Sequence, residues 1–186
     1  MIILQPCFKN VDSLKDYNVD FVKLKLGQHS FNYRISDSFF KIKEHSLIEQ
    51  GEIDVHLLID KKERLMNLTF TFQGKVRTDC DICLDSIQLP VKGEETMVVK
   101  IVEQPRESDS EILYLGPNDI SFNIYDPVYE FICTSLPLSK ACRDDISGTK
   151  VCNPAMLKFL SESKEENSSI ENETDPRWDK LKNIKE

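Results

Sequence analysis

The residues with the clearest chemical potential are Cys80 and Cys83, which stand at C-x-x-C spacing in the short stretch RTDCDICLD. A tight turn with this spacing lets two thiolates point at one ion, so the pair can form half of a tetrahedral zinc site. The same spacing occurs in redox-active dithiols, and two small buried thiols would also be compatible with it. The pair alone leaves all three interpretations open.

Cys142 and Cys152 can supply the other half of a zinc site. They lie in the stretch ACRDDISGTKVCNP, and the longer gap between them would have to close as a loop. Asn153 and Pro154 look like the start of a helix, which would put the Cys152 thiolate beside a helix N-terminus, where negative charge is favoured. Four cysteines are therefore available as ligands of one structural Zn2+: Cys80, Cys83, Cys142 and Cys152. Incidental thiols are the competing interpretation.

A thiol-disulfide oxidoreductase that uses the Cys80 and Cys83 pair is the alternative function. In such enzymes the C-x-x-C motif belongs at the start of a helix that follows a parallel strand, and the active thiol has a lowered pKa. Here Asp79, Asp81 and Asp85 surround the pair, and their negative charges would raise the pKa of a thiol. These neighbours disfavour the redox interpretation without removing it.

The composition is that of a globular protein with one main domain. The chain has 186 residues, of which 40% are hydrophobic and 30% are charged. No apolar run is long enough for a signal peptide or a membrane span, so we expect a cytoplasmic protein with no membrane partner. The net charge of −8 opposes broad attachment to nucleic acid and suits a basic protein partner, although it could equally serve solubility.

Alternation of apolar and polar residues predicts a mainly antiparallel β-sheet, either open or barrel-like. The expected strands cover residues 19–26, 31–35, 53–59, 68–72, 95–102, 112–115 and 120–124. Six side chains should face one core, because a register slip of one residue would bury Asp54 and Asn67 instead. They are Ile53, Val55, Leu57, Leu68, Phe70 and Phe72.

Two or three short helices complete the predicted α+β fold. Residues 37–50 contain no helix breaker and should form a helix that ends at Gly51. A second helix should begin with Asp126 as its cap and end before Pro137. Its apolar stripe includes Cys133, which we expect to be a packed thiol rather than a ligand. A third helix is expected over residues 155–160.

Three parts are expected along the chain. Residues 1–160 should form a single α+β domain, and 161–174 an acidic disordered linker, since 161–175 contain six acids and one lysine. Residues 175–186 should form a helix that is too short to be stable alone and must dock on a surface. That surface belongs either to a partner or to the protein's own domain. The residues predicted to dock on a partner are Asp175, Pro176, Arg177, Trp178 and Leu181.

Four stretches, CDICLDSIQLPVKGEE, YEFICTSLPL, CNPAML and DPRWDKLKNI, follow one another in this order. In this combination the chain resembles the YceD family, the large ribosomal RNA subunit accumulation proteins, in the form typical of Bacteroidetes. The resemblance covers nearly the whole chain. Family members carry the C-x-x-C turn at Cys80 and Cys83 and a cysteine at Cys152, and many have His in place of Cys142. Because Cys and His both ligate zinc, the resemblance strengthens the prediction of a structural zinc site.

The resemblance implies a role in the accumulation of large-subunit (23S) ribosomal RNA, and therefore in ribosome assembly, without an enzymatic activity. The implied partner is large-subunit ribosomal RNA, a basic large-subunit ribosomal protein, or both, with no small-molecule substrate. The residues agree with this expectation, because His29, His45 and His56 have no nucleophile pattern beside them.

Overall fold

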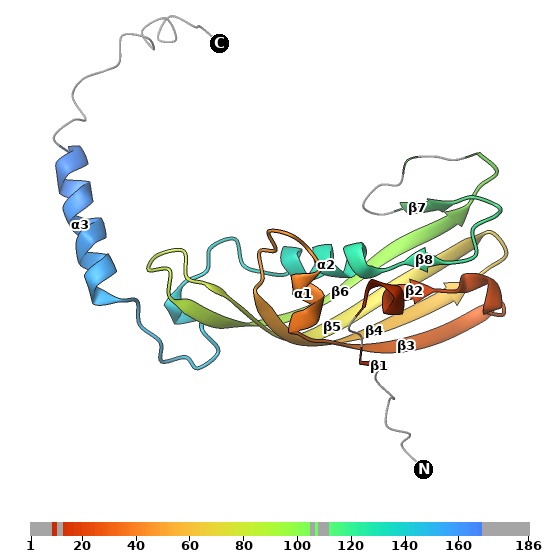
Figure 1. Ribbon diagram of the computed structural model, residues 1–186, viewed down its shortest axis with the longest axis horizontal. Coiled ribbons are helices and arrows are strands. Elements are labelled where there is room, and N and C mark those ends of the chain that lie inside the picture. The colour runs from red at the N-terminus through yellow and green to blue at the C-terminus, as the bar shows by residue number, and fades with distance from the viewer. Residues whose placement is uncertain (1–8, 11–12, 105–106, 108–111, 169–186) are drawn as a thin grey trace, which may run out of the picture.

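A six-stranded sheet forms the centre of the computed structural model, which describes residues 9–10, 13–104, 107 and 112–168 (Figure 1). The strand order is β1-β3-β4-β5-β6-β7. The strands are β1 Lys9–Asn10, β3 Gly27–Ile35, β4 Gln50–Lys61, β5 Leu65–Asp79, β6 Ser86–Ile101 and β7 Ile112–Leu115. The four long strands β3 to β6 pair antiparallel, and only the short β1 and β7 pair in parallel. The prediction of a mainly antiparallel sheet is confirmed.

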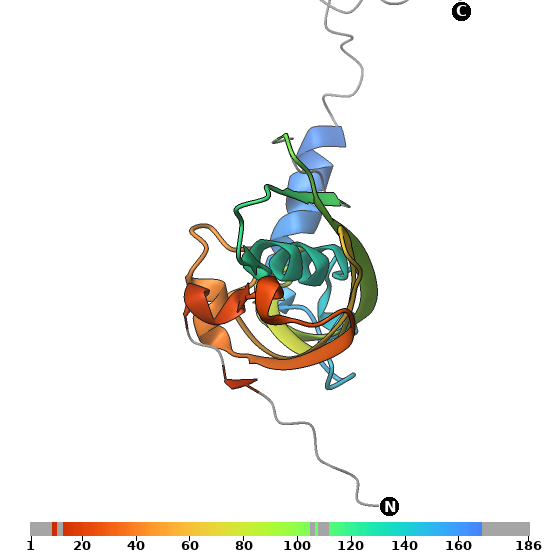
Figure 2. The ribbon, with the colours of Figure 1, turned by 90° about the vertical axis from the view of Figure 1, so that its right-hand side faces the viewer.

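The sheet curls around the helices, as the end-on view shows, but it does not close into a barrel (Figure 2). Across the described part of the chain, the strand order ends at β1 on one side and at β7 on the other. These two edge strands are short, and the helices α1 Asp37–Lys41 and α2 Tyr125–Thr134 occupy the concave face between them (Figure 1). The barrel-like alternative is therefore wrong.

The core lies on the concave face of the sheet. The six side chains predicted to face it are all buried, with exposed fractions between 0% and 3%. The register explains this, because Val55 of β4 lies opposite Phe72 of β5 and Leu57 lies opposite Phe70. Asp54 faces the other side of the sheet, where its carboxylate accepts a hydrogen bond from Arg34 Nε at 2.8 Å. The predicted register of this hairpin is confirmed.

The helix predicted over residues 37–50 is wrong beyond Lys41. The chain reaches a left-handed conformation at His45, with φ of 58°, and a right-handed helix cannot continue through it. The Ser46 hydroxyl then donates to the Ile48 carbonyl at 2.8 Å, and the Tyr129 hydroxyl of α2 accepts the Leu47 N–H at 3.2 Å. Packing against α2 thus turns this segment back toward the sheet and buries Ile48 completely.

The strand predicted over residues 19–26 is also wrong. Only β2 Asn18–Val19 is extended there, where it pairs with β8 Phe122–Asn123, and a 3-10 turn, η2 Phe21–Lys23, follows. The ammonium group of Lys61 donates to the carbonyls of Phe21 at 2.6 Å and Leu24 at 2.8 Å. A lysine from the neighbouring hairpin therefore satisfies carbonyls that a strand would have paired. The strand predicted over residues 120–124 likewise shortens to β8, whereas residues 112–115 form β7 as predicted.

Helix α2 begins one residue earlier than its predicted cap. The N-cap position is Ile124, which has no capping side chain, and Asn123 Oδ1 accepts the N–H of Tyr125 at 2.7 Å. The prediction that Asp126 caps the helix is therefore wrong. Asp126 instead forms an ion pair with Lys43 at 3.2 Å. The apolar stripe of the helix is oriented as predicted, with Val128, Tyr129 and Ile132 buried.

The β5–β6 hairpin is much longer than the sequence predicts, because its pairing continues to Asp79 opposite Ser86. Gly74, Pro90 and Gly93 suggest interruptions here, yet each is accommodated. A Cβ atom at Gly74 would lie 2.1 Å from the Glu52 carbonyl oxygen, so the close approach of β4 requires glycine. Pro90 lies where β6 has β5 on one side only. As a result, the loop with Cys80 and Cys83 stands at the tip of a long hairpin.

The third helix, α3 Pro154–Ser168, is longer than predicted and includes residues 161–168, which the sequence assigns to a disordered linker. Lysines and glutamates favour helix, and Lys158 and Glu162 form an i,i+4 ion pair at 3.7 Å. Residues 169–186, with the rest of the predicted linker and the predicted docking helix, lie outside the described residues. None of the helices in the described ranges has the length and apolar character needed to cross a bilayer.

Candidate metal centre

The loop at the tip of the β5–β6 hairpin holds the first two cysteines in a tight turn. The N–H of Cys80 donates to the Asp85 carbonyl, and the N–H of Leu84 donates to the Cys80 carbonyl, both at 2.9 Å. Leu84 is in the left-handed region with φ of 60°, which lets the loop close in so few residues. The backbone N–H of Ile82 points at the Cys80 sulfur at 3.4 Å. The turn therefore presents both sulfurs to one point.

The other two cysteines come from the segment that follows α2. Cys142 opens a 3-10 turn, η3 Cys142–Asp144, which is closed by the Asp144 carboxylate accepting the Ala141 N–H at 2.9 Å. Cys152 stands just ahead of α3. Asn153 caps that helix, with its Oδ1 accepting the N–H of Ala155 at 3.0 Å. The predicted helix start after Cys152 is confirmed.

The four cysteine sulfurs meet in one cluster, here called the cysteine centre, in which all lie within 4.8 Å of one another. The Cys80 and Cys152 sulfurs are 3.8 Å apart, and those of Cys83 and Cys142 are 3.4 Å apart. A disulfide would need about 2.05 Å, so these are free thiols. Tetrahedral zinc with Zn–S bonds of about 2.3 Å has sulfur–sulfur edges of about 3.8 Å. The donor set and its spacing therefore fit a tetrahedral metal ion.

Burial shapes the ionisation of these thiols. Cys80, Cys83 and Cys142 are buried and Cys152 is half-buried. Burial raises the pKa of the Cys142 and Cys152 thiols. Burial acts on Cys80 in the same direction, but the N–H groups of Cys83 and Ile82 outweigh it and lower the pKa of Cys80 to about 7. Four thiolates this close repel one another, so a divalent cation is what would let all four ionise together.

Asp81 and Asp145 join the β5–β6 hairpin to the segment that contains Cys142 through hydrogen bonds that do not involve the sulfurs. The Asp81 N–H donates to the Lys140 carbonyl at 2.8 Å, and the Asp81 carboxylate accepts the Lys140 N–H at 2.7 Å. This N–H and the nearby ammonium group hold the pKa of Asp81 below its usual range. The Asp145 carboxylate accepts the Gln88 N–H of β6 at 2.7 Å, and its bonds from Ser147 help to lower its pKa to about 2. Hydrogen bonds to backbone groups therefore hold the two halves of the cysteine centre together without any bond between the sulfurs.

These carboxylate contacts are the part of the site that the sequence did not predict. In the sequence both residues count only as negative charges near the cysteines, and neither is predicted to make a structural contact. The sequence feature that could have indicated these contacts is an acidic residue within three positions of a cysteine in each pair. These residues are Asp81 and Asp145. Cys133 lies outside the cluster on α2, half-buried against the core, and burial raises its pKa. Cys7 and the predicted docking residues Asp175, Pro176, Arg177, Trp178 and Leu181 fall in ranges that the structure leaves undescribed.

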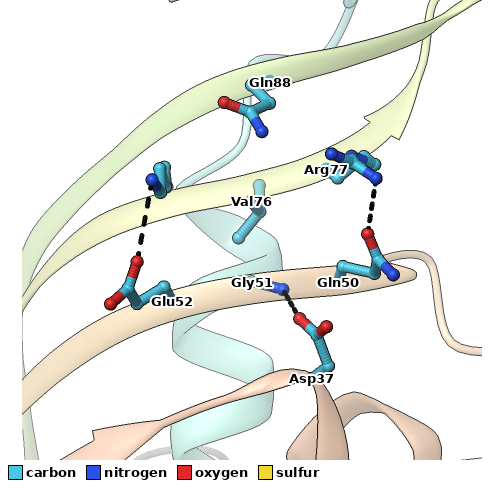
Figure 3. Close-up of a pocket in the computed structure, with 8 residues that line it drawn as sticks. Asp37, Gln50, Gly51, Glu52, Val76, Arg77 and Gln88 are labelled. Atoms are coloured by element: carbon cyan, nitrogen blue, oxygen red, sulfur yellow. Dashed lines mark hydrogen bonds and ion pairs between the residues drawn. The ribbon is translucent and has the colours of Figure 1, made fainter.

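A shallow hollow of about 180 Å³ lies beside β4, β5 and β6, near the start of β4 (Figure 3). Its polar groups pair with one another, so they fix the strand ends rather than present free charge. The pairs are Arg77 with Gln50 at 2.7 Å, Lys75 with Glu52 at 3.6 Å, and the Gly51 N–H with Asp37 at 3.0 Å.

Comparison with known proteins identifies one family. Residues 68–185 match the model of the family described as Large ribosomal RNA subunit accumulation protein YceD. No curated protein and no solved structure matches the chain. The matched range begins within β5 and includes the whole hairpin loop, α2, the cysteine centre and α3. Because it spans more than half of the 186 residues, the chain belongs to the YceD family.

Proposed function

We propose that this protein is a non-enzymatic assembly factor that supports the accumulation of large-subunit ribosomal RNA, and that its cysteine centre binds one structural zinc ion. The observation that carries the proposal is the family match, since the family is described by this role and the matched range contains all four cysteines. Nothing in that description names a chemical reaction.

The geometry of the centre supports a structural metal. Catalytic zinc keeps an open position for water or substrate, whereas four protein thiolates complete a tetrahedral shell. The ligands come from the β5–β6 hairpin loop and from the segment between α2 and α3, which are far apart in the sequence. The metal would therefore tie the tip of the hairpin to the C-terminal part of the chain.

The lowered pKa of Cys80, about 7, is one feature that the oxidoreductase alternative would need, but the geometry disfavours that alternative. The C-x-x-C pair lies in a hairpin loop between antiparallel strands rather than at the start of a helix. The side chains of Cys80 and Cys83 are 0% and 4% exposed, so a disulfide partner has poor access to either sulfur. The Cys83 sulfur lies 3.4 Å from that of Cys142, which is not part of the C-x-x-C pair.

A basic large-subunit ribosomal protein is the partner that the charge favours. The net charge of −8 would repel ribosomal RNA phosphates and attract lysine- and arginine-rich protein. From the sequence we also propose that the segment from Asp175, with Trp178 and Leu181 as apolar anchors, contacts this partner.

Affinity capture of the full-length protein from its host, with and without ribonuclease, tests the proposed function. We expect a defined basic large-subunit protein to remain bound after RNA digestion, because protein contacts make the attachment. Loss of every ribosomal protein on digestion would mean that RNA makes the attachment instead. A complete absence of large-subunit components before digestion would contradict the assembly role.

Deletion of residues 175–186 should separate docking from stability. If this segment docks on a partner, the truncated protein should keep the thermal midpoint and zinc content of the full chain, while co-purification with large-subunit particles weakens. A drop of several degrees in the midpoint would place Trp178 in the protein's own core, since loss of a packed aromatic costs about 3 to 5 kcal/mol. Particle binding that survives the deletion unchanged would rule out the docking role.

A further inference from the structure

Exposed apolar side chains gather around the cysteine centre. In the hairpin loop, Ile82 and Leu84 flank Cys83, and their exposed fractions are 38% and 68%. Val151, which precedes Cys152, is 79% exposed. Because the cysteine sulfurs lie within 4.8 Å of one another, the two segments that carry these side chains meet at one end of the protein. Apolar surface concentrated in this way is typical of an interaction site.

Helix α3 starts two residues after Cys152 and carries further exposed apolar side chains. At 100° per residue, Met156, Leu157, Phe159 and Leu160 fall within an arc of about 160° around the helix. Met156 packs against the core, whereas Leu157 is 43% exposed and Phe159 is 64% exposed. Figure 1 shows α3 standing apart from the sheet and from α1 and α2. A helix of this length is marginally stable alone in water, so burial of its apolar side by a partner would stabilise it.

The sequence that follows Leu160 indicates which class of partner fits this surface. Residues 161–175 contain six acidic residues and one lysine. This charge would repel RNA phosphates, and it would also repel a second copy of the same chain. A polypeptide rich in lysine and arginine would be attracted to it. Hydrophobic and charge complementarity therefore favour one occupant, a basic protein segment with an apolar anchor of its own.

We propose that the surface formed by Ile82, Leu84, Val151, Leu157 and Phe159, here called the apolar end, docks a lysine- and arginine-rich segment of a large-subunit ribosomal protein. The proposal rests on the proposed function and names the surface through which it acts. Phe159 is the main anchor, because a large aromatic side chain that is exposed in the free protein gains most from burial at an interface. A metal ion bound at the cysteine centre would also shape this surface, because it would hold the hairpin loop and the start of α3 side by side.

Binding of purified large-subunit ribosomal proteins, stripped of RNA and presented one at a time to the immobilised full-length protein, tests this surface. We expect at least one basic protein to bind, and Leu157→Ser combined with Phe159→Ser to weaken that binding about tenfold or more, as loss of an aromatic anchor does. Ile120→Ser is the matched control, because Ile120 is 69% exposed but lies between β7 and β8, away from α3. It should leave the binding unchanged.

Unfolding and zinc content should be the same for the double variant and the wild type, since both replaced side chains are exposed. Binding that the double variant retains in full would overturn the proposal. So would self-association of the wild type that the variant abolishes, because the occupant would then be a second copy. Either result leaves the proposed function standing if the ribonuclease capture still yields large-subunit proteins, so the two failures are distinguishable.

Discussion

Replacing Cys83 with serine is expected to remove the bound metal and to destabilise the protein on the order of 10 kcal/mol, the scale of structural zinc binding. That is comparable with the whole stability of a domain, so the hairpin tip and the segment that contains Cys142 should lose their order. Serine is not a zinc ligand at neutral pH, and the change leaves three thiols of the cysteine centre without their fourth partner. Metal content by plasma mass spectrometry and thermal unfolding by circular dichroism measure the two effects together.

Cys133→Ser is the matched control for this substitution. Cys133 is a half-buried free thiol that packs against the core from α2 and does not belong to the cysteine centre. This variant should keep full zinc content and unfold near the wild-type midpoint. The zinc hypothesis fails if Cys83→Ser retains the metal, or if both variants lose the same amount of metal and stability.

Phe39→Ala is expected to lower the free energy of unfolding by about 3 to 5 kcal/mol, as large aromatic truncations in cores do. Phe39 of α1 is 0% exposed. Its ring centroid lies 4.6 Å from that of Tyr125 and 5.2 Å from those of Tyr17 and Phe40. Its carbonyl also accepts the Tyr125 hydroxyl at 3.2 Å. Urea unfolding followed by circular dichroism measures the loss.

Phe159→Ala makes the same chemical change on an exposed residue, because Phe159 is 64% exposed on α3. Its loss should stay within about 0.5 kcal/mol, the usual size for a surface substitution. Equal losses for the two variants would mean that the aromatic cluster around Phe39 does not anchor the helices to the sheet. Both variants should retain zinc under native conditions, since neither residue belongs to the cysteine centre.

The β4–β5 hairpin could be predicted from the sequence because the alternation of apolar and polar residues within each strand determines its buried face. Alternation over Ile53 to Ile59 and over Leu68 to Phe72 fixes which faces are buried, and a register slip would bury Asp54. The far half of the β5–β6 hairpin could not be predicted in this way. Gly74 and Gly93 are required there because Glu52 and Phe72 approach them too closely for a side chain. Such contacts exist only in the folded sheet.

The segment after α1 shows why the helix predicted over residues 37–50 ends at Lys41. Residues 42–50 have no breaker, so local propensity favours helix, but the Tyr129 hydroxyl and the core position of Ile48 favour a turn. Tertiary contacts to α2 override a weak local preference here. The same reasoning applies to η2, where Lys61 supplies the hydrogen bonds from a strand far along the chain.

The identity of the four candidate ligands could be predicted from cysteine type and spacing, because thiol chemistry is a property of the residue itself. The distances between their sulfurs could not be predicted, because two long-range hydrogen bonds position the loop that carries Cys142. The Asp145 carboxylate accepts the Gln88 N–H of β6, and the Lys140 N–H donates to the Asp81 carboxylate. These contacts join residues more than fifty positions apart, and no local pattern encodes them.

X-ray absorption at the zinc edge of protein purified without chelators tests the central claim most directly, because it reports the atoms bound to the metal. One zinc per chain with four sulfur ligands at about 2.3 Å is the predicted result. Protein that carries no zinc, or a zinc shell with fewer than four sulfurs, would contradict the assignment of Cys80, Cys83, Cys142 and Cys152 as one structural metal centre.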